Sequence, residues 1–286
     1  MTKQTVIKGL TRTHLILFIA TLLTTLSAGA LMDGHDIFSN PLLIINGYPF
    51  SFTLLLILGC HEFGHYYYAR KHNVDATLPY FIPVPPPITI IGTFGAFIKM
   101  RGMIPNRRAL LEIGAAGPIA GFIIAVPMLF VGLNLSTIVD LQTVDGGFML
   151  GDSIILKMAT DFVFPNLPEN ADILLHPIAF AGWIGLFVTM LNLIPIGQLD
   201  GGHIAYALLG KNHLKLAQAM FVALILMGIF LSMNWLIWAI LILLLMRSVQ
   251  HPPIFGIELP LGKHEKIIGW ICLIIFILCF VPTPFG

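Results

Sequence analysis

Seven long apolar runs, separated by short polar segments, constrain this chain more than any other feature. They cover residues 15–32, 50–69, 109–133, 173–196, 214–233, 235–246 and 267–281. A helix of about 20 apolar residues is long enough to cross the hydrocarbon core of a bilayer. Only 10% of the 286 residues are charged, whereas about a quarter are charged in a typical soluble domain. The sequence therefore predicts an all-α polytopic membrane protein of about seven transmembrane helices, forming a single membrane-embedded domain over residues 1–286.

The distribution of Lys and Arg predicts the orientation of these helices. Positive charge is concentrated in residues 1–14, 70–108, 211–215 and 247–266. Between them, residues 33–49 carry no Lys or Arg, and residues 134–172 carry only Lys157. Because loops rich in Lys and Arg stay on the cytosolic side, we expect a cytosolic N-terminus and a non-cytosolic loop over residues 134–172. The first run also resembles a secretory signal, but a chain that is embedded throughout does not need one, so we expect a retained span in the cell membrane.

Net charge and cysteine positions exclude two classes of function. The formal net charge is +1, and no Lys- or Arg-rich run is present, so we expect no nucleic-acid partner. The three cysteines, Cys60, Cys272 and Cys279, lie inside apolar runs. This position argues against a disulfide framework or a cysteine-only metal site. The lipid bilayer is the partner that composition alone predicts.

The segment 79–103 does not fit the helical pattern. It reads PYFIPVPPPITIIGTFGAFIKMRGM, and proline at this density excludes the interior of a helix. The β-branched residues around Gly92 and Gly95 favour two short strands around a glycine turn. We expect a short re-entrant β-hairpin that enters the membrane from the cytosolic side, where it must pack on protein or line a watery cavity. The alternative is an ordinary apolar loop in the cytosol.

Three titratable residues stand near the end of the second apolar run, in the stretch LGCHEFGHYYYAR. In a helix, His61 and His65 lie one turn apart on the same face, so both imidazoles can bind one metal ion. Glu62 is angled to reach a water beside that metal. This H-E-x-x-H spacing is that of zinc metalloproteases, in which the carboxylate takes a proton from water. The alternative is a pair of hydrogen-bonded core histidines with a surface glutamate, which is disfavoured because ionisable groups at membrane depth are costly and usually functional.

A catalytic zinc site needs a third protein ligand, and the residues alone leave two choices. The elongated motif with a third histidine is absent, because its position is occupied by Lys71. Glu112 lies at the start of the third apolar run, where it also suits a helix cap. Asp200 lies in NLIPIGQLDGGH at the end of the fourth run. There Pro195 and a glycine pair predict a broken helix, from which an aspartate can turn inward.

The stretches HEFGH and NLIPIGQLDGG, with GTFGAFI and RRALLEIGAAGPIAGF between them, resemble the site-2 protease family of intramembrane zinc metalloproteases. The resemblance covers residues 50–210 and implies a metalloprotease core there. It implies that Zn²⁺ is held by His61, His65 and Asp200, with Glu62 as the catalytic general base. The chain departs from many relatives by lacking the strand pattern of a PDZ domain between the third and fourth runs. IGQLDGG also replaces the commoner proline just before the leucine.

The same resemblance implies how a substrate is held. Asn192 matches the family asparagine that is thought to orient substrate near the metal. Residues 88–100 resemble a re-entrant β-hairpin that is thought to receive an unwound substrate by strand addition. The substrate-binding residues of that edge would be Thr93, Phe94, Gly95, Ala96 and Phe97.

Together these features predict an intramembrane zinc endopeptidase that cuts within or next to transmembrane segments of membrane-anchored substrates, in regulated intramembrane proteolysis. One alternative is a catalytically silent scaffold that binds transmembrane helices, which the complete ligand and base set disfavours. The other is a metal transporter, which is disfavoured because the sequence shows no internal repeats and no second polar span.

Three further features carry weaker expectations. Gly117 and Gly121 are four residues apart, which predicts a small-residue face for close helix packing. His203 follows Asp200 by one helical turn, and a supporting position beside the metal is the less favoured interpretation. His251 precedes two prolines, so we expect a turn residue rather than a metal ligand.

Overall fold

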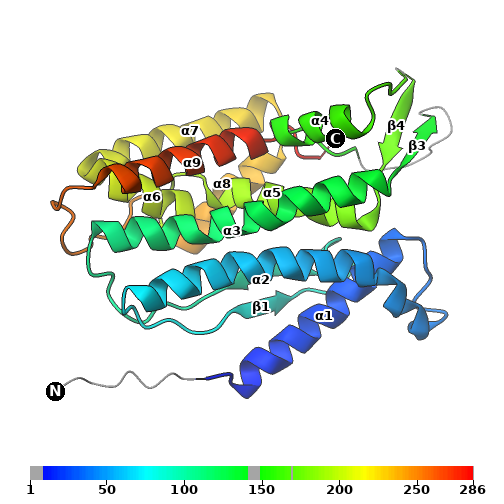
Figure 1. Ribbon diagram of the computed structural model, residues 1–286, viewed down its shortest axis with the longest axis horizontal. Helices are drawn as coiled ribbons and strands as arrows, with labels where there is room; N and C mark the ends of the chain where they lie inside the picture. Colours follow the sequence, from blue (N-terminus) through cyan, green and yellow to red (C-terminus); the bar gives the residue numbers. More distant parts are fainter. Residues whose placement is uncertain (1–8, 141–148, 169, 286) are drawn as a thin grey trace.

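The computed structural model describes residues 9–140, 149–168 and 170–285. Its helices run largely side by side, and its strands form two small sheets (Figure 1). The elements in chain order are α1 (Arg12–Met32), the 3-10 helix η1 (Pro41–Gly47), α2 (Tyr48–Lys71), β1 (Tyr80–Pro83), β2 (Thr93–Phe97), α3 (Arg107–Asn134), β3 (Thr137–Asp140), α4 (Ile154–Val163), β4 (Ala171–Leu174), α5 (Pro177–Asn192), α6 (Asp200–Leu209), the 3-10 helix η2 (Gly210–Asn212), α7 (His213–Phe230), α8 (Asn234–Met246) and α9 (Lys263–Cys279).

Four helical segments in the described chain are long and apolar enough to cross a membrane. They are Arg12–Met32, Pro41–Lys71, Arg107–Asn134 and Asp200–Phe230. The other helices on apolar runs are shorter, with 16 residues in α5, 13 in α8 and 17 in α9. The chain thus carries the helices of a membrane protein, but the predicted number of seven spans is not confirmed.

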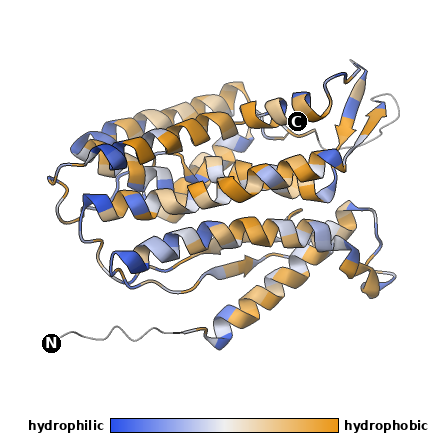
Figure 2. Ribbon diagram, in the orientation of Figure 1, coloured by the Kyte–Doolittle hydropathy of each residue, from blue (hydrophilic) through white to orange (hydrophobic). Residues whose placement is uncertain are grey.

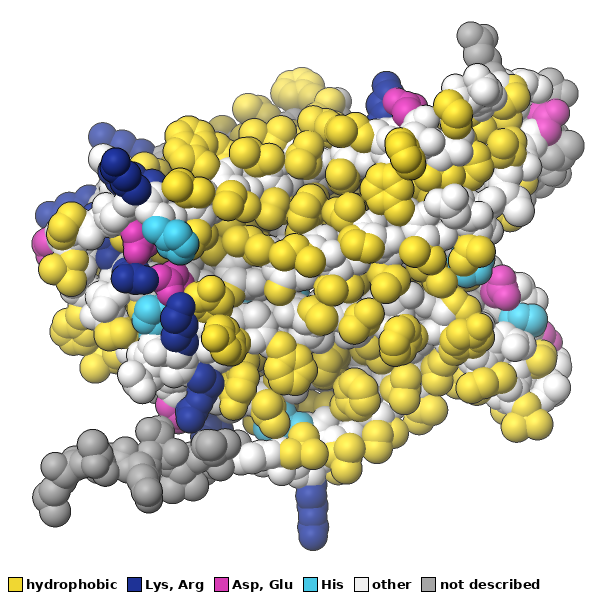
Figure 3. Space-filling view, in the orientation of Figure 1, with side chains coloured by type: hydrophobic (Ala, Val, Ile, Leu, Met, Phe, Trp, Pro, Cys, Tyr) yellow, Lys and Arg dark blue, Asp and Glu magenta, His cyan; other side chains and the backbone are white. Residues whose placement is uncertain are grey.

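The surface agrees with a bilayer around these helices. Apolar residues cover the helices along most of their length (Figure 2). On the face shown in Figure 3, hydrophobic side chains form a broad belt, and Lys and Arg gather at one end of it. At that end α2 finishes with Lys71 and α3 starts with Arg107.

Helix α3 is the centre of the fold and contacts α2, α5, α6 and α9. It begins after Asn106, whose side-chain oxygen accepts a hydrogen bond from the Ala109 N–H at 2.9 Å, as N-cap residues do. Small residues let the neighbouring helices come close: a Cβ on Gly132 would lie 2.0 Å from the backbone nitrogen of Ala179. Close approach through small residues is the usual packing mode of membrane helices.

The fourth apolar run differs from its prediction as one helix over 173–196. Its first residues belong to β4, which pairs antiparallel with β3. Helix α5 starts only at Pro177, with His176 as its N-cap, because proline suits the first turn of a helix. Residues 134–172, predicted as a loop, contain β3 and the helix α4, while residues 141–148 lie outside the described part. The side of the membrane on which this segment lies stays a prediction.

The expected pair of strands within residues 79–103 is present. Strand β1 pairs antiparallel with β2, with Tyr80 opposite Phe97 and Pro83 opposite Thr93. The prediction placed both strands around Gly92, after the prolines, and this was wrong for the first strand. It ends at Pro83 and precedes Pro85, Pro86 and Pro87, which lie in the connection, where no backbone donor is needed. Gly92 has φ +78°, and a Cβ there would lie 2.4 Å from the Thr24 carbonyl oxygen, so the hairpin packs tightly against α1.

Candidate metal centre and active site

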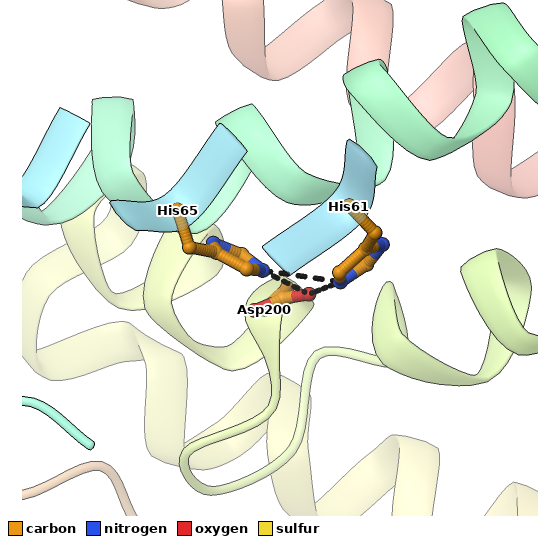
Figure 4. Close-up of side chains that lie close together, drawn as sticks. All are labelled: His61, His65 and Asp200. Atoms are coloured by element: carbon orange, nitrogen blue, oxygen red, sulfur yellow. Dashed lines mark hydrogen bonds and ion pairs between the residues drawn. The ribbon is translucent and has the colours of Figure 1, made fainter. Parts of the chain in front are cut away.

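Two histidines on α2 and the first residue of α6 converge on one point (Figure 4). The Nε2 atoms of His61 and His65 are 3.1 Å apart, and each lies 3.3 Å from Oδ2 of Asp200. Ligand atoms bound tetrahedrally to zinc at about 2.0–2.1 Å stand about 3.3 Å from one another. The spacing of the three donors therefore fits a single zinc ion, which His61, His65 and Asp200 would hold.

The two histidines have room because α3 presents glycines to them. A Cβ on Gly117 would lie 2.0 Å from Nε2 of His65, and a Cβ on Gly121 would lie 3.2 Å from Nδ1 of His61. The glycine face predicted for helix packing therefore packs against the metal centre itself. The sequence contained a signal for this contact, because the two glycines are four residues apart and so are the two histidines.

Hydrogen bonds orient the rings. Nδ1 of His65 lies 2.7 Å from the carbonyl oxygen of Ile113. A carbonyl only accepts, so Nδ1 carries the proton and Nε2 is left as a lone-pair ligand, an arrangement common around protein metals. Nδ2 of Asn192 lies 3.3 Å from Nε2 of His61. The structure thus places Asn192, predicted to bind substrate, beside a candidate metal ligand.

A break between α5 and α6 delivers Asp200. Helix α5 ends at Asn192, and Asp200 begins α6 after a seven-residue connection. The connection turns sharply at Gly197, which has φ +56° and donates its N–H to the carbonyl of Val249 at 2.9 Å. A Cβ on Gly201 would lie 1.9 Å from the Leu193 carbonyl oxygen. The glycines after Asp200 therefore let the start of α6 fold back against the end of α5.

Glu62 lies beside the three donors. Glu62 is only 7% exposed, and its carboxylate interacts electrostatically with His61, His65 and Asp200. The backbone of Ile98, directly after β2, lies close enough to interact with this carboxylate. Glu62 is therefore a buried site residue rather than the surface glutamate of the alternative interpretation, and the hairpin reaches it.

A cleft of about 660 Å³ opens between the hairpin and the start of α6. Its walls are formed by β1, by β2 with the residues that follow it, by the α5–α6 connection and by α6, and its lining residues are Tyr80, Phe97, Ile98, Lys99, Met100, Arg101, Gln198 and His203. Ile98 also contacts Glu62. The cleft therefore borders Ile98, the residue whose backbone interacts with Glu62.

The five residues predicted to bind substrate form β2. Thr93 is fully buried and donates its hydroxyl to the Ile82 carbonyl at 2.7 Å, so its side chain supports the hairpin. Phe94 is exposed and Phe97 lines the cleft. The sheet has two strands, so one edge of β2 faces no other strand of the described chain, and the backbone of Gly95 and Ala96 lies along it.

Glu112, the other candidate ligand, lies away from the metal centre. Its Oε2 is 2.9 Å from Nε2 of His72 and 3.6 Å from Nζ of Lys71, and its Oε1 accepts from Nε of Arg108 at 2.7 Å. Arg108 also contacts Glu265 of α9 at 3.1 Å. Glu112 therefore joins the charged ends of α2, α3 and α9, and Asp200 alone of the two candidates meets the histidine pair.

The sequence is similar to known peptidases over most of its length. A profile described as peptidase family M50 matches residues 49–235. The probable zinc metalloprotease EGY2, chloroplastic, of Arabidopsis thaliana is 30% identical over 255 residues, which is 87% of this chain and 44% of that protein. EGY1 of the same plant, with the same description, is 32% identical over 242 residues, or 82% of this chain and 43% of that protein. The chain thus spans less than half the length of these relatives. No solved structure matches it significantly.

Proposed function

Since the chain belongs to peptidase family M50, the site-2 protease family, we propose that it is an intramembrane zinc endopeptidase. In this proposal it hydrolyses peptide bonds within or next to transmembrane segments of membrane-anchored proteins. The observation that carries the proposal is the triangle of His61, His65 and Asp200 with the buried Glu62 beside it. Relatives named as probable zinc metalloproteases support the same chemistry.

Each site residue has a separate task in this reaction. His61, His65 and Asp200 hold the zinc, which when bound polarises the scissile carbonyl and makes water a better nucleophile. Glu62 accepts the proton of the attacking water and returns it to the leaving amine. Asn192, whose Nδ2 lies beside His61, donates to the oxyanion that forms on the carbonyl oxygen when water attacks the carbon.

The hairpin supplies a place for an extended substrate. A substrate helix uses its carbonyls in its own hydrogen bonds, so it must unwind before one of them can be attacked. The open edge of β2 offers replacement backbone hydrogen bonds through strand addition. Because Ile98 contacts Glu62, a strand that follows β2 to its end arrives at the general base.

The proposal includes an orientation in the cell membrane. Lys99 and Arg101 line the cleft, and Lys71 and Arg107 mark the same charged end of α2 and α3. By the positive-inside rule this end, with the metal centre and the N-terminus, faces the cytosol. The plant relatives are named chloroplastic, so fractionation of cells together with labelling of a cysteine placed at Lys99 tests the membrane and its side.

The test uses the full chain in liposomes with a single-span reporter. The wild type is compared with Glu62→Gln, which keeps the shape of the side chain but removes the base, and with the exposed-site control Glu258→Gln. Zinc content is measured for all three. We expect the wild type and the control to cut the reporter, and Glu62→Gln to retain zinc but lose at least 100-fold in rate, about the least that a general base contributes.

The rival functions give other results. A helix-binding scaffold would bind zinc and the reporter without cutting it in any variant. A metal transporter would move zinc across the liposome membrane, and mutation of Asp200 would reduce this uptake. If the wild type cuts the reporter and Glu62→Gln cuts it equally fast, the assignment of the base is wrong.

A further inference from the structure

A second histidine pair lies close behind the metal centre. His203 is on α6, one turn after Asp200, and His251 lies in the connection between α8 and α9. Both side chains are buried, and Nδ1 of His203 is 2.7 Å from Nε2 of His251. His251 thus lies in a connecting loop, as the two following prolines suggested, but its side chain is buried.

The hydrogen bonds fix the proton positions in this pair. Nδ1 of His251 lies 2.5 Å from the carbonyl oxygen of Pro252. A carbonyl has no proton to give, so Nδ1 of His251 donates and its Nε2 carries a lone pair. Nδ1 of His203 must then be the donor to that lone pair. The remaining nitrogen of His203, Nε2, is consequently left unprotonated and able to accept.

The surroundings hold His251 in this state. The ring of Tyr206 stacks on it with centroids 4.5 Å apart, and His213 contacts it edge-on at 6.2 Å. Burial, with a smaller effect from His213, lowers the pKa of His251 to about 4. His251 is thus neutral at pH 7, and its lone pair remains available to orient His203.

His203 is the member of the pair that reaches the cleft, which it lines together with Ile98 and Lys99. An unwound substrate brings backbone N–H groups into this cleft, and a buried N–H without an acceptor is costly. The open edge of β2 satisfies one side of an added strand. The other side faces α6, where His203 is the lining residue with a fixed acceptor.

We propose that His203 binds the substrate backbone, accepting a hydrogen bond at Nε2 from an N–H of the extended polypeptide in the cleft. His251 is the positioning residue, because it acts only by fixing the proton of His203. The inference rests on the proposed peptidase function, and it adds to it a backbone contact on the wall opposite β2. The ligand class is an extended peptide, recognised by its main chain and not by its side chains.

Two conservative variants distinguish the role of Nδ1 of His203 from the role of its Nε2. In His203→Asn the amide nitrogen can still donate to His251, but nothing replaces the acceptor at Nε2. In His203→Gln the longer side chain carries an amide oxygen to the place of Nε2. With a single-span peptide substrate and the full chain, we expect His203→Asn to raise KM about tenfold, the order of one hydrogen bond. kcat and zinc content should stay unchanged, and His203→Gln should recover most of the loss.

A modified substrate identifies the donor. Replacing single amides on either side of the scissile bond by esters removes one N–H at a time. At one position the ester should raise KM of the wild type by a similar factor, and at that position His203→Asn should cause no further increase. Ester effects that multiply with His203→Asn at every position would overturn the proposal.

The outcomes also separate this inference from the proposed function. If His203→Asn lowers kcat or releases zinc at unchanged KM, then His203 supports the metal centre and does not bind substrate, so the inference fails while the peptidase remains. If no reporter is cut by the wild type while zinc is bound, the proposed function fails, and the inference falls with it.

Discussion

Nε2 of His65 occupies the space that a side chain on Gly117 would need, since a Cβ at that glycine would lie only 2.0 Å from it. The neighbouring pair is looser, because a Cβ on Gly121 would lie 3.2 Å from Nδ1 of His61. In this close-packed interface a displaced ring cannot keep its place at the metal. Glycine at these two positions is therefore needed both for the close packing of α2 against α3 and for the placement of the histidine rings at the candidate metal centre.

We predict that Gly117→Ala loses most of its bound zinc and with it the activity. The added methyl group either turns the His65 ring away or separates α2 from α3. Gly121→Ala should show a smaller loss, because a shift of a few tenths of an ångström relieves its contact. Gly59→Ala on α2 is the control, since a Cβ there meets no atom within 4 Å. Zinc per protein, measured by atomic absorption, should follow this order. Full zinc binding by Gly117→Ala would contradict the assigned geometry.

Asp200→Asn tests the third ligand. The amide keeps the size of the side chain but lacks the negative charge, so zinc should bind at least tenfold more weakly. Binding to the folded state raises stability by about 2.7 kcal/mol at a zinc concentration 100 times Kd. A chelator should therefore lower the Tm of the wild type and of Asp161→Asn, an exposed change on α4, but leave Asp200→Asn almost unaffected. Equal chelator effects in all three proteins would remove Asp200 from the ligand set.

Glu112→Gln should lower stability without disturbing the metal. Glu112 is 3% exposed and joins Arg108, His72 and Lys71. Its loss removes charged hydrogen bonds, each worth about 1.5–3 kcal/mol, although solvent around the exposed Arg108 and Lys71 reduces this sum. We expect a loss of about 1–3 kcal/mol in the free energy of unfolding, while zinc content stays that of the exposed-site control Glu258→Gln. Loss of zinc would return Glu112 to the list of candidate ligands.

The meeting of the candidate metal ligands was more predictable from the sequence than the hairpin was. Helical spacing alone puts His61 and His65 on one face, and that prediction needs no tertiary contact. The residues did not choose between Asp200 and Glu112, because the end of the fourth apolar run and the start of the third lie at a similar depth in the membrane. The choice depends on tertiary contacts, in which Glu112 is occupied by cations from α2 and α3 and Asp200 is carried inward by the break before α6.

Short apolar stretches account for the errors in the fold. Residues 171–174 form β4 and not the start of a helix, and a short apolar run cannot be assigned to strand or helix by its pattern alone. The first strand of the hairpin was placed after the prolines because the residues there are β-branched. The observed register brings Tyr80 opposite Phe97, and the ring of Tyr80 also stacks on His14 of α1 at 4.0 Å. Such a partner is invisible in the local sequence.

Helix α4 should lie with one face in lipid. Ile154, Met158 and Phe162 are exposed and four residues apart, hence on one side. Phe162 also contacts Phe130 of α3 edge-on at 5.9 Å, so this side continues the apolar surface of a spanning helix. A nitroxide at Met158→Cys should be more accessible to oxygen than to a polar nickel relaxant in liposomes, and one at Lys157→Cys should show the reverse. The native cysteines are first replaced by alanine. Equal accessibilities at both sites would place α4 in water.

Stability should fall with acidification because His251 is buried in its neutral form. Its pKa in the folded protein is lowered to about 4 by burial, against about 6.5 in an unfolded chain. Between these values the unfolded chain binds more protons, so the free energy of unfolding decreases as pH falls from about 6.5 toward 4 and is unaffected by this group above about 7. The groups that face His251 are His203 and Tyr206 on α6 and His213 on α7.

The matched variant is His251→Gln, which keeps an acceptor for His203 but cannot titrate in this range. Tm is measured for both proteins from pH 8 to pH 5 in the presence of chelator, so that competition between protons and zinc does not contribute. We expect His251→Gln to be the less stable protein at pH 8, because its packing against Tyr206 is poorer. Its Tm should then fall less steeply than that of the wild type, and the two curves should converge toward pH 5. Parallel curves would show that His251 takes up no proton on unfolding and would contradict its burial as a neutral ring.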